Sequence, residues 1–86
     1  MQVDIYTTRQ CPYCNAAKAL LKRKGVAFTE IDIAANIERL NEMVARADGA
    51  ATLPQIFIGS VHVGGSDDLR ALEKAGKLDA LLAEGV

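Results

Sequence analysis

The apolar positions in the first half of the chain predict a strand, a helix and a second strand. Residues 3–7 alternate apolar and mixed side chains, which is typical of a half-buried strand. Pro12 suits the first position of a helix because its ring presets φ, and the following apolar residues keep helical spacing until Gly25. Residues 26–33 are rich in β-branched side chains and predict the second strand.

The middle of the chain predicts a second helix and then a hairpin. Asn36 is expected to cap this helix, which ends near Asp48 and Gly49 and carries four apolar residues on one face: Ile37, Leu40, Val44 and Ala47. Residues 55–58 and 61–63 form two short apolar runs around Gly59 and Ser60. Two strands joined by two residues, with glycine first, predict a type II′ turn.

The last part of the chain predicts two further helices. Ser66 is expected to cap the third helix, with Asp67 and Asp68 in its first turn and Gly76 at its end. A short helix carrying Leu78, Leu81 and Leu82 follows. The resulting order is β-α-β-α-β-β-α-α, an α/β sheet covered by helices in one domain over residues 1–86.

Composition and charge exclude several classes of protein. Half of the residues are hydrophobic and 24% are charged, which is typical of a globular chain. A net charge of −1 supplies no excess of bases for nucleic-acid binding, and the apolar runs are too short to span a membrane. The charge is nevertheless uneven, at about +4 over residues 1–25 and about −5 over the rest. We interpret the bases at residues 22–24 as a solvated helix end.

Cys11 and Cys14 are the two cysteines of the chain and stand where the first helix begins. A disulfide bridge between them closes too short a loop to stabilise the fold much. A zinc site needs four ligands, and the chain offers these two cysteines and one histidine, His62. The positive end of a helix favours the thiolate of Cys11, and Cys14 lies one turn further in. The pair therefore predicts redox chemistry with Cys11 as nucleophile and Cys14 as resolving thiol; a structural bridge, half a metal site and an inert pair are the alternatives.

Three segments together resemble the glutaredoxin family over nearly the whole chain. They are Cys-Pro-Tyr-Cys at residues 11–14, Thr-Leu-Pro-Gln-Ile-Phe-Ile at residues 52–58 and Gly-Gly-Ser-Asp-Asp-Leu at residues 64–69. The resemblance implies a thioredoxin-like fold with a four-stranded mixed sheet of order 2-1-3-4. It also implies a cytoplasmic, monomeric enzyme that uses glutathione as co-substrate to reduce disulfide-bonded and glutathionylated proteins, without a metal.

The resemblance also carries a set of binding residues. It implies a cis Pro54, a Leu53 backbone that pairs with glutathione, and a third helix whose first amides bind the γ-glutamyl carboxylate. The implied contacts with glutathione are Tyr13, Thr52, Leu53, Pro54, Gly65, Ser66, Asp67 and Asp68, and we add Arg9 as a candidate contact. The plainer alternatives are an exposed aromatic for Tyr13 and helix-dipole partners for the two aspartates.

Two departures from the family pattern affect the binding site. Ser66 stands where relatives commonly have cysteine, and Thr8 stands where many have a lysine for the glycine carboxylate of glutathione. Arg9 is the nearest base that could replace that lysine. Two other functions stay open at this point: reduction by thioredoxin reductase, and a dimeric [2Fe–2S] carrier that uses Cys11 and glutathione thiols.

Overall fold

The computed structural model describes residues 2–9 and 11–84, and its elements follow the predicted order. They are β1 (Val3–Thr7), α1 (Pro12–Arg23), β2 (Thr29–Asp32), the 3₁₀ helix η1 (Ile37–Arg39), α2 (Leu40–Arg46), β3 (Gln55–Ile58), β4 (Val61–Gly64), α3 (Ser66–Lys74) and α4 (Leu78–Glu84).

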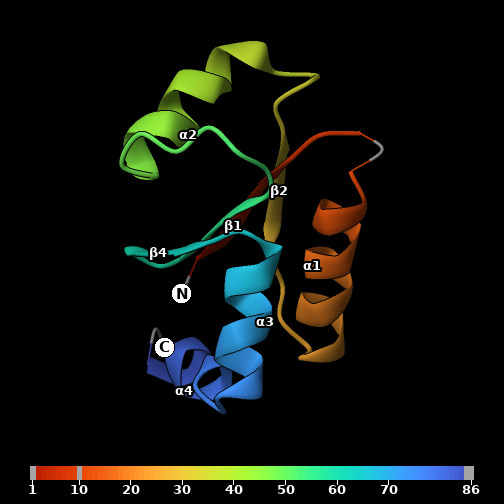
Figure 1. Ribbon diagram of the computed structural model, residues 1–86, viewed down its shortest axis with the longest axis vertical. Helices are drawn as coiled ribbons and strands as arrows, with labels where there is room; N and C mark the ends of the chain where they lie inside the picture. Colours follow the sequence, from red (N-terminus) through yellow and green to blue (C-terminus); the bar gives the residue numbers. More distant parts are fainter. Residues whose placement is uncertain (1, 10, 85–86) are drawn as a thin grey trace.

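The four strands form one mixed sheet in the order β2-β1-β3-β4, which confirms the predicted order 2-1-3-4. β1 pairs in parallel with β2 and antiparallel with β3, and β3 and β4 form the predicted hairpin. Gly59 has a φ of +61° at the first central position of the hairpin turn, as a type II′ turn requires. In Figure 1, α1 and α3 lie side by side, and α2 lies at the opposite end of the molecule from α4.

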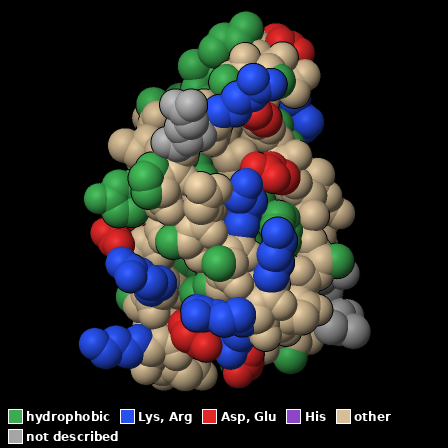
Figure 2. Space-filling view, turned by 90° about the vertical axis from the view of Figure 1, so that its right-hand side faces the viewer, with side chains coloured by type: hydrophobic (Ala, Val, Ile, Leu, Met, Phe, Trp, Pro, Cys, Tyr) green, Lys and Arg blue, Asp and Glu red, His purple; other side chains and the backbone are tan. Residues whose placement is uncertain are grey.

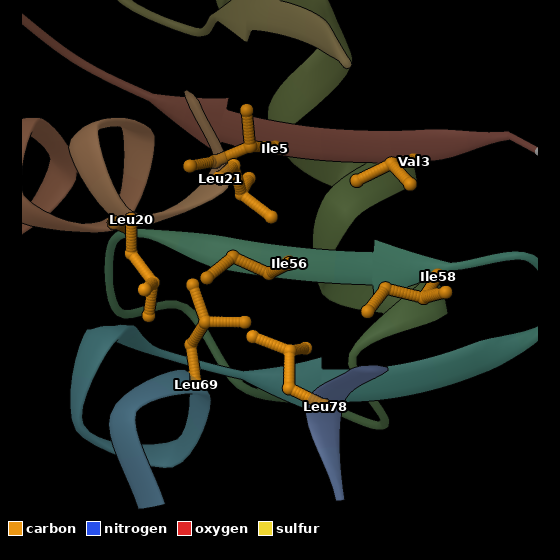
Figure 3. Close-up of a cluster of buried hydrophobic side chains, with 9 residues drawn as sticks. Val3, Ile5, Leu20, Leu21, Ile56, Ile58, Leu69 and Leu78 are labelled. Atoms are coloured by element: carbon orange, nitrogen blue, oxygen red, sulfur yellow. The ribbon is translucent and has the colours of Figure 1, made fainter. Parts of the chain in front are cut away.

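Alternate residues of the central strands divide the core into two clusters, one on each face of the sheet. On one face, Val3 and Ile5 of β1 and Ile56 and Ile58 of β3 meet side chains from the helices, as Figure 3 shows. The helical members of this first cluster are Ala17, Leu20, Leu21, Leu69 and Leu78. It fixes α1 and α3 against the sheet, so the start of each helix has a defined place.

The second cluster joins the other face of the sheet to α2. Tyr6 of β1 and Phe57 of β3 contact each other edge to face, with ring centroids 5.7 Å apart, and pack in the same cluster as Met43. The Tyr6 hydroxyl donates to Glu42 and accepts from Arg46, whose guanidinium lies 4.1 Å from the Phe57 ring centroid. These contacts anchor α2 to β1.

Three predictions of local structure were wrong in detail. The second strand runs from Thr29 to Asp32 and is shorter than residues 26–33. At its start, the Val26 N–H donates to the Leu21 carbonyl of α1; at its end, Asp32 accepts the backbone N–H groups of Ala34 and Ala35. Asn36 precedes a 3₁₀ turn and makes no side-chain cap; its amide donates to the Asp32 carbonyl instead.

The same 3₁₀ turn changes which apolar residues of the second helix are buried. Ile37 is 65% exposed, whereas Met43, which the helical pattern omitted, is fully buried. The third correction is at α3: Gly65 is the N-cap residue, and Ser66 is the first residue of the helix.

Lys and Arg side chains gather on the side of the molecule where α1 lies (Figure 2). Lys22 and Arg23 are exposed, as predicted for a solvated helix end, whereas Lys24 lies within 2.9 Å of carboxylates of Glu73 and Asp79. Within residues 2–9 and 11–84, no helix has the length and apolar character needed to cross a membrane.

Candidate active site

Cys11 is the N-cap residue of α1, in the position that the sequence predicted. Its backbone is extended, with φ −102° and ψ 105°, and Pro12 begins the helix. The Cys11 Sγ accepts a hydrogen bond from the Cys14 backbone N–H at 3.2 Å. An amide donor at the positive end of a helix favours negative charge on that sulfur, which is the form that attacks disulfides.

Cys14, in the first turn of α1, has the opposite environment, because its side chain is fully buried. The pKa of Cys14 is raised to about 11, mainly by burial and also by its side-chain hydrogen bond with Cys11. The Thr8 backbone and the charge of Lys18 lower the pKa by smaller amounts. The partly exposed thiol is therefore suited to attack, and the buried one to act after a mixed disulfide has formed.

The buried thiol of Cys14 makes the stability of the reduced protein depend on pH at the alkaline end. An unfolded cysteine loses its proton near pH 9, whereas Cys14 in the folded chain keeps it to about pH 11. Between these values the unfolded chain binds fewer protons, so the free energy of unfolding falls as pH rises, by up to roughly 2–3 kcal/mol.

Urea unfolding of the reduced protein across this pH interval measures the effect, with Cys14→Ser as the matched control. All other residues are the same in both proteins, so the difference between the two curves reports the Cys14 thiol together with its interaction with Cys11. An equal fall of stability in the wild type and in Cys14→Ser would contradict the prediction.

Next to the dithiol lies a surface groove of about 350 Å³, which we call the Pro54 groove. Every predicted contact with glutathione except Arg9 lines it: Tyr13, Thr52, Leu53, Pro54, Gly65, Ser66, Asp67 and Asp68. The Leu53–Pro54 peptide bond is cis, as the family resemblance implied. The groove therefore joins three segments that are far apart in the sequence: the start of α1, the loop before β3 and the start of α3.

The start of α3 has a backbone geometry that depends on its glycine pair. Asp68 Oδ2 accepts the Gly65 N–H at 2.9 Å and so caps the helix from within its first turn. Gly64 has a φ of +110°, and a Cβ at this position would lie 2.4 Å from the same carboxylate oxygen. A side chain at residue 64 would thus displace the cap.

Ser66 lines the Pro54 groove from the first turn of α3. Its side chain is buried, and its Oγ has no hydrogen-bond partner among the described residues. Buried polar groups are normally paired, so an unpaired hydroxyl beside free helix N–H groups marks a place for an acceptor from a ligand. The sequence predicted a contact at Ser66 but assigned its side chain to capping, which was wrong.

Arg9 is the predicted contact that lies apart from the groove lining. Its side chain is 84% exposed, and its Nε lies 4.0 Å from Asp32 Oδ2. Conversely, Gln55 and His62 line the groove but were not predicted as site residues. The sequence signal for both was a polar residue inside an otherwise apolar strand.

The comparisons agree on one family. The sequence profile described as Glutaredoxin matches residues 3–63. A glutaredoxin from Pseudomonas aeruginosa is 60% identical over 81 residues, which cover 94% of this chain and 95% of that protein.

Two solved structures extend the agreement to the fold. The solution structure of glutaredoxin from Brucella melitensis is 60% identical and superimposes with a TM-score of 0.85, covering 100% of this chain and 92% of the other. The crystal structure of a buckwheat glutaredoxin–glutathione complex is 26% identical with a TM-score of 0.86, covering 96% and 77%. The chain therefore belongs to the glutaredoxin family of thiol oxidoreductases.

Proposed function

We propose that the protein is a glutathione-dependent thiol–disulfide oxidoreductase, with Cys11 as nucleophile and Cys14 as resolving thiol. The observation that carries the proposal is the unpaired Ser66 hydroxyl at the start of α3, in a groove that is also lined by Tyr13, the residue before Cys14. A peptide thiol with a carboxylate at its far end fits this arrangement. The buckwheat relative was crystallised with glutathione, which supports the same ligand.

Each part of the Pro54 groove has a role in this proposal. The Ser66 hydroxyl and the first N–H groups of α3 bind the γ-glutamyl carboxylate, as helix N-termini bind anions. Asp67 meets the ammonium group, because its ion pair with Arg70 is exposed and readily exchanged, whereas Asp68 already caps α3. The Leu53 backbone, with Thr52 and Pro54 beside it, pairs with the peptide, and Gly65 lets the chain approach.

Removal of glutathione from a protein needs only one cysteine. The Cys11 thiolate attacks the glutathione sulfur of the mixed disulfide, forms a Cys11–glutathione disulfide and releases the protein thiolate. A second glutathione thiolate then attacks the glutathione sulfur on Cys11. This step yields oxidised glutathione and restores the Cys11 thiolate. In the net exchange one glutathione thiol is consumed: its sulfur is oxidised, the protein sulfur is reduced to a thiol, and the glutathione sulfur of the mixed disulfide leaves in oxidised glutathione.

Reduction of a protein disulfide needs both cysteines. Cys11 attacks one sulfur and forms a mixed disulfide with the protein; Cys14 then loses its proton and attacks the Cys11 sulfur. The protein leaves as a dithiol and a Cys11–Cys14 disulfide remains, which two glutathione molecules reduce. Because burial raises the pKa of Cys14, its thiol stays protonated while Cys11 attacks the substrate. Cys14 then acts in the second step, on the mixed disulfide.

Replacing Ser66 with alanine tests the groove assignment. Loss of one hydrogen bond to the carboxylate should raise KM for a glutathionylated peptide roughly three- to tenfold and leave kcat nearly unchanged. Ser66→Thr keeps the hydroxyl and is the matched control for a change at this buried position. A KM unaltered in Ser66→Ala would show that the carboxylate binds elsewhere.

Arg9 is proposed to bind the glycine carboxylate of glutathione, since Thr8 offers no charge there. The ion pair of Arg9 with Asp32 is long and exposed, and such pairs contribute little, so the guanidinium is available to a ligand. Arg9→Ala should raise KM by roughly tenfold at low salt, and less at high salt. Arg23→Ala, at the far end of α1, is the control. An equal effect of both changes would indicate general attraction rather than a contact.

The same proposal extends to partners and location. We propose that the substrates are glutathionylated and disulfide-bonded proteins, and that the chain acts as a monomer in the cytoplasm. The support is the family itself, including the bacterial relative from Pseudomonas aeruginosa.

A further inference from the structure

A chain of hydrogen bonds runs from β4 across the start of β3 to the loop that lines the Pro54 groove. His62 Nε2 lies 2.6 Å from Gln55 Oε1. The Gln55 Nε2 donates to the Thr52 carbonyl oxygen at 3.0 Å and to the Thr52 Oγ1 at 3.1 Å. All three residues line the groove, and the chain spans the Leu53–Pro54 segment that we assign to glutathione binding.

The direction of every bond in this chain follows from what each atom can do. The Thr52 carbonyl can only accept, so the amide nitrogen of Gln55 must face Thr52 and the amide oxygen must face His62. That oxygen can also only accept, so His62 must carry a hydrogen on Nε2. The two Thr52 oxygens take both hydrogens of the Gln55 amide nitrogen, so this nitrogen has no donor left for another partner.

Thr52 is left with one unused donor as a consequence. Its Oγ1 accepts from Gln55, so the hydrogen of the hydroxyl is free for another partner, and no described residue accepts it. We propose that Gln55 and His62 are positioning residues that hold Thr52 as a hydrogen-bond donor to the peptide of glutathione in the Pro54 groove. The inference rests on the proposed function and adds two residues to the specificity of that site.

The anchoring of this chain in the sheet makes the positioning effective. Gln55 is 3% exposed and pairs with Tyr6 on β1, whereas Thr52 is exposed in a loop. The His62 ring stacks on the Phe57 ring, with centroids 4.9 Å apart and an angle of 23° between the planes. The buried Phe57 thus fixes His62, His62 fixes Gln55, and Gln55 orders Thr52 before a ligand arrives, which lowers the entropy lost on binding.

Two replacements of His62 separate its hydrogen bond from its packing. His62→Phe keeps a ring that can stack on Phe57 and removes the N–H donor. His62→Gln removes the ring and keeps an amide N–H with similar reach. We expect His62→Phe to raise KM for a glutathionylated peptide about three- to tenfold with kcat within about twofold, and His62→Gln to restore KM to within about twofold of wild type.

A double-mutant cycle shows whether the effect passes through Thr52. Thr52→Val removes the hydroxyl and keeps the side-chain shape, so His62→Phe should change KM less in the Thr52→Val background than in wild type. The inference is overturned if the increase in KM of the double variant equals the product of the increases in the two single variants. It is also overturned if His62→Gln raises KM as much as His62→Phe does. Thermal unfolding of each variant checks that the chain remains folded.

The tautomer of His62 tests the chain of hydrogen bonds without any ligand. Long-range ¹H–¹⁵N spectra of the free protein, with neutral imidazole, should show the hydrogen on Nε2; a hydrogen on Nδ1 alone would overturn the inference. Turnover by wild type with KM unchanged in His62→Phe would overturn this inference and leave the proposed function standing. No turnover by wild type with glutathione would remove both.

Discussion

Cys11→Ser should lose all thiol–disulfide exchange, both with glutathionylated peptides and with protein disulfides. A serine hydroxyl at the helix N-cap can accept the Cys14 N–H as the Cys11 sulfur does, but it does not ionise near neutral pH and forms no disulfide. We expect the rate to fall by on the order of 1,000-fold or more, to the background of the assay. The exchange rate is measured in separate assays with a glutathionylated peptide and with a protein disulfide.

The matched control for this change is the same replacement three residues further along. Cys14→Ser removes one thiol from the same helix and leaves the attacking sulfur in place. If Cys11→Ser kept measurable exchange while Cys14→Ser lost it, the assignment of attacking and resolving thiols would be reversed.

Cys14→Ser should divide the two activities. Removal of glutathione from a peptide should continue within a few-fold of the wild-type rate, because free glutathione resolves the disulfide on Cys11. Reduction of a protein disulfide should fall by roughly 100-fold, because no internal thiol completes the exchange. Parallel assays of the two substrates at one glutathione concentration give the ratio.

Trapping adds a second readout for this variant. Cys14→Ser should accumulate a mixed disulfide with the protein substrate, visible by mass spectrometry under non-reducing conditions. Equal loss of both activities, without a trapped species, would contradict the division of roles.

The sequence was sufficient for elements with a strong local pattern. β1, α1 and the hairpin were predicted correctly, because each depends on residues within its own segment. These are the alternating apolar residues of β1, Pro12 at the start of α1 and Gly59 in the hairpin turn. The order of the strands came from the family resemblance and is confirmed by the structure.

The details that were missed depend on which of several neighbouring polar side chains binds a given backbone N–H. The sequence predicted Asn36 as a helix cap, but Asp32 accepts the N–H groups before it and a 3₁₀ turn follows. This turn leaves Ile37 exposed, while Met43 is buried. The sequence also predicted Ser66 as a helix cap, but Gly65 is the N-cap residue and its N–H donates to Asp68. Competition between nearby acceptors decides such positions, and spacing alone does not show it.

At the site, some residues could be assigned from their neighbours in the sequence, and others only from contacts between separate segments. Cys11 and Cys14 could be assigned from their place at a helix start. The link from His62 through Gln55 to Thr52 could not, because it joins one strand to a loop across the neighbouring strand. The sequence showed only that Gln55 and His62 are polar residues in apolar strands. Their hydrogen-bond partners, which the structure gives, show that they connect to Thr52.

The most direct measurement of the central claim is turnover by the wild-type protein with glutathione as the reductant. A glutathionylated peptide, glutathione, glutathione reductase and NADPH are combined, and NADPH oxidation is followed with and without the protein. We predict saturable turnover that requires glutathione and disappears in Cys11→Ser. Turnover that proceeds only with thioredoxin reductase, or none with glutathione at any concentration, would contradict the account.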